Sequence, residues 1–71
     1  MFIDNSIILR EDLPKALKRD FEELQSYYDA GDEVMFDVTL DGVEATVKSY
    51  YHVSLISREE LNMIFRKYGM G

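Results

Sequence analysis

The chain has 71 residues, 46% of them apolar and 31% charged, with a formal net charge of −6. A chain of this length forms one small domain with a thin hydrophobic core. It has no cysteine, which excludes disulfides, a thiolate nucleophile and a cysteine-ligated zinc site. No apolar run approaches the ~18 residues of a membrane span, and residues 1–9 lack the pattern of a signal peptide. We therefore expect a cytoplasmic protein that does not enter a membrane.

The charges are unevenly distributed along the chain. Residues 20–44 contain nine acidic side chains and no lysine or arginine, whereas the remainder contains five acids and eight bases. Binding to phosphate backbones needs a dense basic face, so we expect no direct binding of nucleic acid. A small basic cluster is the local exception, and it comprises Arg10, Lys15, Lys18 and Arg19. The acidic block is typical of a solvated face.

The first elements are an extended arm and a helix. Residues 1–11 are largely apolar but are interrupted by Asp4-Asn5-Ser6, which favours an arm laid on the core. Residues 12–30 follow a helical period, with Pro14 in the first turn and Gly31 as the stop signal. The apolar stripe of this predicted helix consists of Leu13, Leu17, Phe21, Leu24 and Tyr28.

The middle segment, residues 32–54, fits two structures. Apolar and polar residues alternate on both sides of Asp41-Gly42, which is typical of a β-hairpin. A helix over residues 32–53 fits equally well, with an apolar stripe of Phe36, Leu40, Val43, Val47 and Tyr50 and a parallel polar stripe of Asp37, Asp41, Glu44 and Lys48. A third stripe is small enough to let a neighbouring helix approach closely, and it consists of Val38, Gly42, Ala45 and Ser49. Propensity favours strands, and the pattern alone leaves both structures open.

The last element, over residues 57–68, is the clearest. Ser57 and Glu60 have the spacing of a capping box, in which each side chain bonds the other residue's backbone N–H. Acids at the start and bases at the end suit the helix dipole. Gly69 supplies the left-handed residue that ends the helix, and Met70 can fold back on Phe65.

Several runs of the sequence carry a resemblance, among them Leu13-Pro14-Lys15-Ala16, Lys18-Arg19-Asp20-Phe21-Glu22, residues 43–51 and Ile64-Phe65-Arg66-Lys67-Tyr68-Gly69. Over most of the chain from Leu13 onward, it resembles small proteins without an established activity that are carried on conjugative and other mobile elements of Gram-positive gut bacteria. The resemblance implies a helical middle segment. The expected fold is therefore an all-α three-helix bundle with an extended N-terminal arm. The alternative is α+β, a helix–β-hairpin–helix. His52-Val53-Ser54-Leu55 departs from the glycine-containing turn of the similar chains.

Motifs for catalysis or for metal binding are missing from the sequence. The run from Asp37 to Gly42 begins like a calcium loop, but the twelfth position is Lys48 where a bidentate glutamate is needed. The only histidine, His52, suits the carboxyl end of a helix better than a catalytic triad. We expect no enzyme, no cofactor and no metal site.

The surplus of aromatic residues and the charge block instead favour a binding role. The expected function is a small non-catalytic protein-interaction or regulatory module that binds a protein partner or a second copy of itself. The alternative is an acidic nucleic-acid mimic that inhibits a basic DNA-binding protein or nuclease. One tyrosine of each pair, Tyr27-Tyr28 and Tyr50-Tyr51, is expected to face outward unless all four rings lie at the core boundary. The candidate interaction residues are Tyr27, Tyr28, Met35, Asp37, Asp41, Glu44, Tyr50 and Tyr51.

Overall fold

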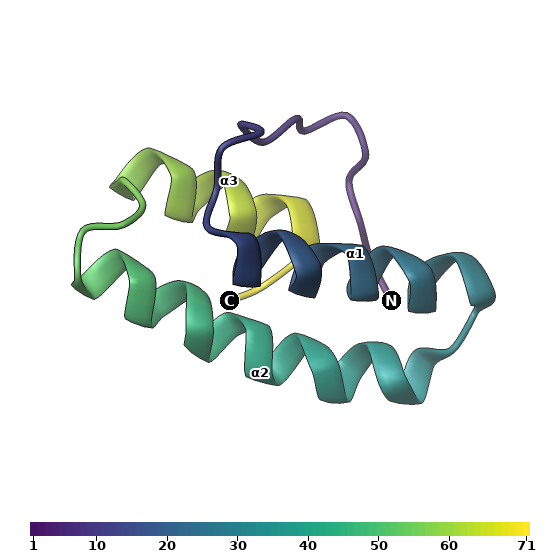
Figure 1. Ribbon diagram of the computed structural model, residues 1–71. Coiled ribbons are helices and arrows are strands. Elements are labelled where there is room, and N and C mark those ends of the chain that lie inside the picture. Colours follow the sequence, from purple (N-terminus) through teal and green to yellow (C-terminus); the bar gives the residue numbers. More distant parts are fainter.

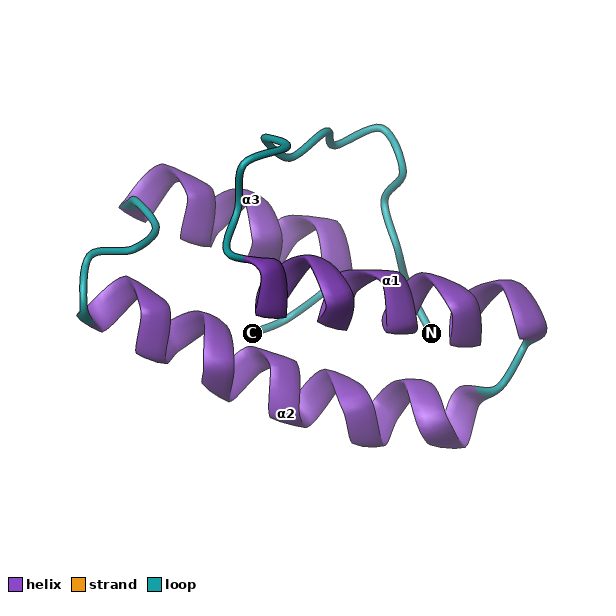
Figure 2. Cartoon of the chain, viewed as in Figure 1, coloured by secondary structure: helices purple, strands orange, loops and turns teal.

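The computed structural model describes all 71 residues. The chain forms three α-helices and no strand. The helices are α1 (Lys15–Ala30), α2 (Glu33–His52) and α3 (Arg58–Tyr68). Helix α2 runs antiparallel to α1, and α3 returns in the direction of α1 (Figures 1 and 2). The expected all-α fold with three helices is confirmed, and α2 occupies residues 33–52 of the segment for which the hairpin was the alternative. None of the three helices is both long enough and apolar enough to cross a membrane.

Each helix contributes one inward stripe to a single core. Most residues of the predicted stripes are buried, whereas Tyr28, Leu40 and Tyr50 are half-buried and pack around the core with Leu61 and Phe65. The twelve buried residues are Ile3, Leu13, Leu17, Phe21, Leu24, Phe36, Val43, Val47, Ile56, Ile64, Tyr68 and Met70. No polar or charged side chain is buried among them, so the core is held together by apolar contacts.

The first helix begins later than the sequence analysis predicted. It was expected to begin at Asp12, but Pro14 has φ −49° and ψ 137° and is the residue before the first helical turn. A residue that precedes proline is pushed away from helical angles, which excludes Leu13 from the helix. Leu13 is nevertheless buried, because it packs on the core from the segment before α1.

The remaining helix ends follow their capping residues. Helix α2 extends over the predicted 32–53 with Asp32 and Val53 as its caps, and the Asp32 side chain accepts a hydrogen bond from the Met35 N–H at 3.2 Å. In α3 both hydrogen bonds of the capping box between Ser57 and Glu60 are present, at 2.8 and 3.1 Å. The Met70 N–H donates to the Phe65 carbonyl at 2.9 Å, which folds the chain end back onto α3.

Residues 1–14 lie against α3 and alongside α1 (Figure 1). The Asp4 N–H donates to the Lys67 carbonyl at 2.7 Å, and Lys67 Nζ donates to the carbonyls of Asp4 and Ile7 at 3.3 and 2.8 Å. Arg10 pairs with Glu60 in α3. No Cα atom of α1 comes within 8 Å of one in α3, so this segment helps to fill the space between the two helices.

Candidate interaction surface

Helix α2 is apolar on two sides, and only one of them faces the core. The inner side buries Phe36, Val43 and Val47. The opposite side, which we call the outer face of α2, consists of Val34, Met35, Val38, Gly42, Ala45 and Ser49, all of them exposed. Most of these residues follow one another at spacings of three and four, so they form one continuous stripe along the helix.

The outer face of α2 is largely uncovered by the rest of the chain. Val34 is 73% exposed and Val38 is 64% exposed, although valine side chains are usually buried. A Cβ atom placed on Gly42 would have no other atom within 4 Å. The small residues were expected to let a neighbouring helix approach closely, but neither α1 nor α3 covers them. The buried contacts of α2 with the rest of the chain come from its inward stripe.

An acidic edge borders the outer face of α2. Asp37, Asp41 and Glu44 each precede a residue of that face by one position, so they share one flank of the helix. Asp37 and Asp41 are exposed and form no ion pair, whereas Glu44 accepts a hydrogen bond from Lys48 Nζ at 3.3 Å. Asp37, Asp41 and Glu44 thus lie together on one flank of the outer face, whereas Met35 lies on the other flank.

The four candidate tyrosines do not join this surface. Tyr27, Tyr28, Tyr50 and Tyr51 are all half-buried and pack against the core. The ring of Tyr28 lies 6.3 Å from that of Phe36, close to the turn between α1 and α2. The expected division of each pair into one inward and one outward ring is wrong, and the interpretation with all rings at the core boundary is confirmed. The two pairs lie at opposite ends of α2.

The acidic block has few cationic partners. Within residues 20–44, Glu33 lies 3.7 Å from the N-terminal ammonium and Glu44 pairs with Lys48. The other acids of the block form no ion pair, and nearly all are exposed on α1 and α2. Exposed acids with little internal compensation attract cationic groups from solution.

The residues considered for metal binding and catalysis are dispersed. No group of three or more histidine, aspartate or glutamate side chains is close enough to hold a metal ion. The run from Asp37 to Gly42 lies in the continuous helix α2, whereas a calcium loop must wrap around its ion. His52 is exposed in the last turn of α2, where an imidazole suits the negative end of the dipole.

Comparison with known proteins identifies no relative of this chain. No protein-family model, no curated protein and no solved structure matches the chain. The exposure of Val34 and Val38 was missed in the sequence because both fit the alternating pattern of a strand. Their spacing of four residues places both on a side of the helix away from Phe36, but this spacing does not say whether another helix covers that side.

Proposed function

We propose that the protein is a small non-catalytic interaction module that binds a partner protein through the outer face of α2. The observation that carries this proposal is an unpartnered apolar stripe on the longest helix of a small chain, with Val34 and Val38 largely exposed. Exposed apolar patches of this kind typically serve protein interfaces. The small side chains of Gly42, Ala45 and Ser49 leave room for a close approach.

The partner is proposed to present an amphipathic helix with basic residues along one edge. Such a helix would place its apolar side on the outer face of α2 and its Lys or Arg side chains against Asp37 and Asp41. Complementary charge at the edge accelerates association and selects the partner, while the apolar stripe supplies most of the affinity. In an association of two copies the acidic edges would repel one another, so a basic partner is favoured over a second copy.

A second candidate function is an acidic mimic of nucleic acid. The observation that favours it is the number of exposed acids of residues 20–44 that have no cationic partner. A basic groove of a DNA-binding protein or nuclease would be the binding site for such a mimic. The resemblance to proteins of mobile elements fits either function, since such elements regulate their own transfer and meet the nucleases of their hosts.

Capture from a lysate of the encoding organism, followed by binding to the purified partner, separates the two functions. For the interaction module, Ala45→Arg should abolish binding because it places a long cation on the stripe, and Asp37→Asn with Asp41→Asn should weaken it several-fold. The matched control is Glu22→Gln with Glu23→Gln on α1, which removes the same charge away from the surface. Binding should largely persist between about 50 mM and about 500 mM salt.

The mimic gives the opposite pattern. Its binding would be lost at high salt and would fall equally with the α1 and α2 substitutions, while Ala45→Arg would have little effect. Binding that survives Ala45→Arg contradicts the proposed surface. Light scattering on the purified chain supplies the remaining comparison, since a stable dimer that Ala45→Arg dissociates would identify a second copy as the partner.

A further inference from the structure

The charges of α1 are arranged against its helix dipole. Lys15 and Lys18 lie in the first turn, where no acid is present, and Asp29 lies in the last turn, where no base is present. The N-terminal end also lacks a side-chain cap. In α3 the arrangement is favourable, with acids in the first turn and bases in the last. The positive end of α1 therefore has several cations and no anion to balance them.

Lys15, Lys18 and Arg19 line a hollow of about 300 Å³, together with the single carboxylate of Glu22. None of the three cations forms an ion pair with an acid of the chain. The positive end of the α1 dipole and three unpaired cations favour an anion at this position.

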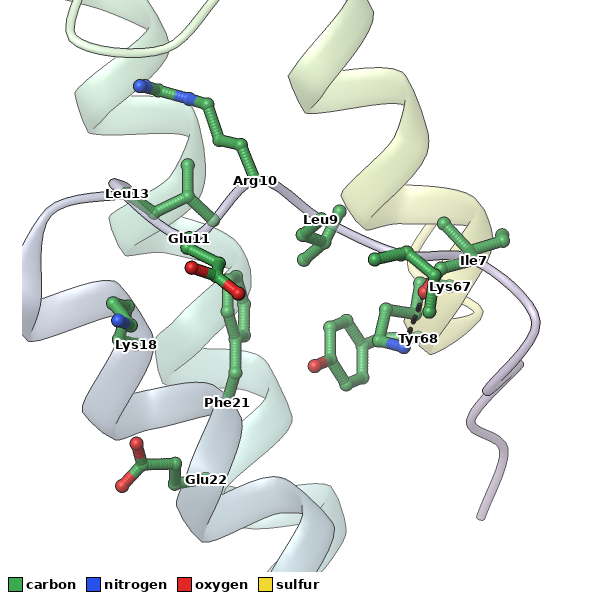
Figure 3. Close-up of a pocket in the computed structure, with 11 residues that line it drawn as sticks. Ile7, Leu9, Arg10, Glu11, Leu13, Lys18, Phe21, Glu22, Lys67 and Tyr68 are labelled. Carbon is green, nitrogen blue, oxygen red and sulfur yellow. Dashed lines mark hydrogen bonds between the residues drawn. The ribbon is translucent and has the colours of Figure 1, made fainter.

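A second cavity adjoins this hollow, and six of its eleven lining residues are apolar, while Arg10, Glu11 and Lys67 are among the charged ones. Its volume is about 280 Å³, and it shares Lys18 and Glu22 with the basic hollow. Figure 3 shows these two residues on the α1 side and the Tyr68 side chain on the opposite side. The remaining apolar walls come from the N-terminal segment and α1, and they are Ile7, Ile8, Leu9, Leu13 and Phe21.

The Tyr68 hydroxyl provides the decisive polar group. Tyr68 is only 3% exposed, and burial raises the pKa of its hydroxyl to about 12 without a hydrogen bond to any residue. Every fully buried side-chain oxygen of the molecule has a hydrogen-bond partner. The Tyr68 oxygen has none, so it must be accessible from the cavity that it lines. Its oxygen points into the space between the segment of Leu9 and α1 (Figure 3). A hydroxyl that is reached only through this cavity can form a hydrogen bond with a polar group that enters the cavity.

We propose that the basic hollow and the apolar cavity together bind a small amphiphilic anion. Its carboxylate or phosphate head lies at Lys15, Lys18 and Arg19. Its aromatic body lies in the apolar cavity, where a polar atom of the ring forms a hydrogen bond with the Tyr68 hydroxyl. The apolar cavity holds about nine water-sized groups, which fits a single ring with a short chain. This site lies on α1, α3 and the N-terminal segment and does not use the outer face of α2.

Nuclear magnetic resonance titration of the whole chain with four probes tests the site. Phenylbutyrate and phenyl phosphate carry both a ring and an anionic head, phenylbutanol has only the ring, and butyrate has only the head. One or both of the two-part probes should shift the amide signals of residues 9, 18 and 68 saturably below about 10 mM, and the stronger one identifies the head group. Each half-probe should bind about tenfold more weakly or worse.

Two variants locate the contacts. Lys15→Gln with Lys18→Gln should weaken the two-part probe about tenfold or more, because a charge-assisted hydrogen bond is lost. Tyr68→Phe keeps the ring and its packing. It should weaken 4-hydroxyphenylbutyrate, whose ring carries a polar atom that can bond the Tyr68 hydroxyl, about threefold, and it should leave phenylbutyrate unchanged. Arg58→Gln is the matched control, since it removes one exposed cation at the start of α3, and the affinity should remain unchanged.

The proposal is overturned if neither two-part probe binds saturably, if phenylbutanol binds as tightly as phenylbutyrate, or if the shifted amides lie on α2. Circular dichroism confirms that the variants remain folded, and a variant that unfolds is replaced by Lys18→Gln alone. Equal binding by wild type and by the lysine variants would also overturn it, because the anionic head would then have no role.

Discussion

The ring of Phe21 in α1 stacks on the ring of Tyr68 in α3, with the centroids 5.0 Å apart and the planes inclined by 17°. The Cα atoms of these two helices nowhere come within 8 Å of each other, so long side chains must make the contact between them. The same ring of Tyr68 closes one side of the apolar cavity. This ring pair therefore joins the helices and at the same time lines the apolar cavity.

Replacing one ring of this pair should destabilise the chain measurably. Phe21→Leu keeps an apolar side chain but removes the stacked ring, and we expect the free energy of unfolding to fall by about 1–2 kcal/mol. Urea denaturation followed by circular dichroism measures this loss. Val53→Ala serves as the control, because Val53 is 64% exposed and its truncation should change stability little. A Phe21→Leu variant as stable as wild type would show that the ring pair contributes no net stability.

The Tyr68 hydroxyl should lose its proton only at high pH. The free energy of unfolding of the chain should therefore depend on pH in the alkaline range. Burial raises its pKa to about 12 in the folded chain, compared with 10.0 for an ordinary tyrosine. Because the folded pKa is the higher one, the stabilisation is complete below about pH 10 and is lost as the pH rises toward 12. The ultraviolet absorbance of tyrosinate, compared between wild type and Tyr68→Phe, should differ by one step centred near pH 12. A difference centred near 10 contradicts the burial of this hydroxyl.

The sequence was sufficient for those features that depend on neighbours along the chain. The Ser57–Glu60 capping box, the end of α3 at Gly69 and the inward stripes of all three helices follow from local spacing. The exposure of Val38 could not be predicted, because periodicity identifies an apolar side without saying whether another helix covers it. The contacts of Lys67 with the Asp4 and Ile7 carbonyls join residues about sixty positions apart, and no local pattern indicates them.

The turn between α2 and α3 contains a non-glycine residue in a left-handed conformation. Ser54 has φ +62°, its N–H donates to the Tyr51 carbonyl at 3.0 Å, and the Leu55 N–H donates to the Tyr50 carbonyl at 2.9 Å. This is the hydrogen-bond pattern of a helix end at which glycine is preferred. Ser54→Gly should raise the free energy of unfolding by about 0.5–1 kcal/mol, because glycine adopts this conformation without steric cost.

A serine-to-glycine substitution in the interior of a helix provides the control for Ser54→Gly. Ser49→Gly lies in the exposed interior of α2 and should lower the free energy of unfolding by about 0.5 kcal/mol, because glycine is a poorer helix former than serine. Thermal denaturation of the two variants should therefore shift the midpoint in opposite directions. A decrease for both would mean that the flexibility of glycine in the unfolded chain outweighs the relief of strain at Ser54.

Glu60 should make the stability of the chain depend on acidic pH. The hydrogen bond from the Ser57 N–H lowers the pKa of this carboxyl below its ordinary 4.5, and pairing with Arg10 lowers it further. A lowered folded pKa stabilises the chain above pH 4.5, and this stabilisation is lost as the pH falls through the folded pKa. Glutamine can still accept the capping hydrogen bond. Glu60→Gln should therefore cost about 0.5–1 kcal/mol at neutral pH and flatten the decline in stability between about pH 5 and 3. Urea denaturation across this range measures both effects. An equally steep decline in Glu60→Gln would assign the acid sensitivity to other carboxyl groups.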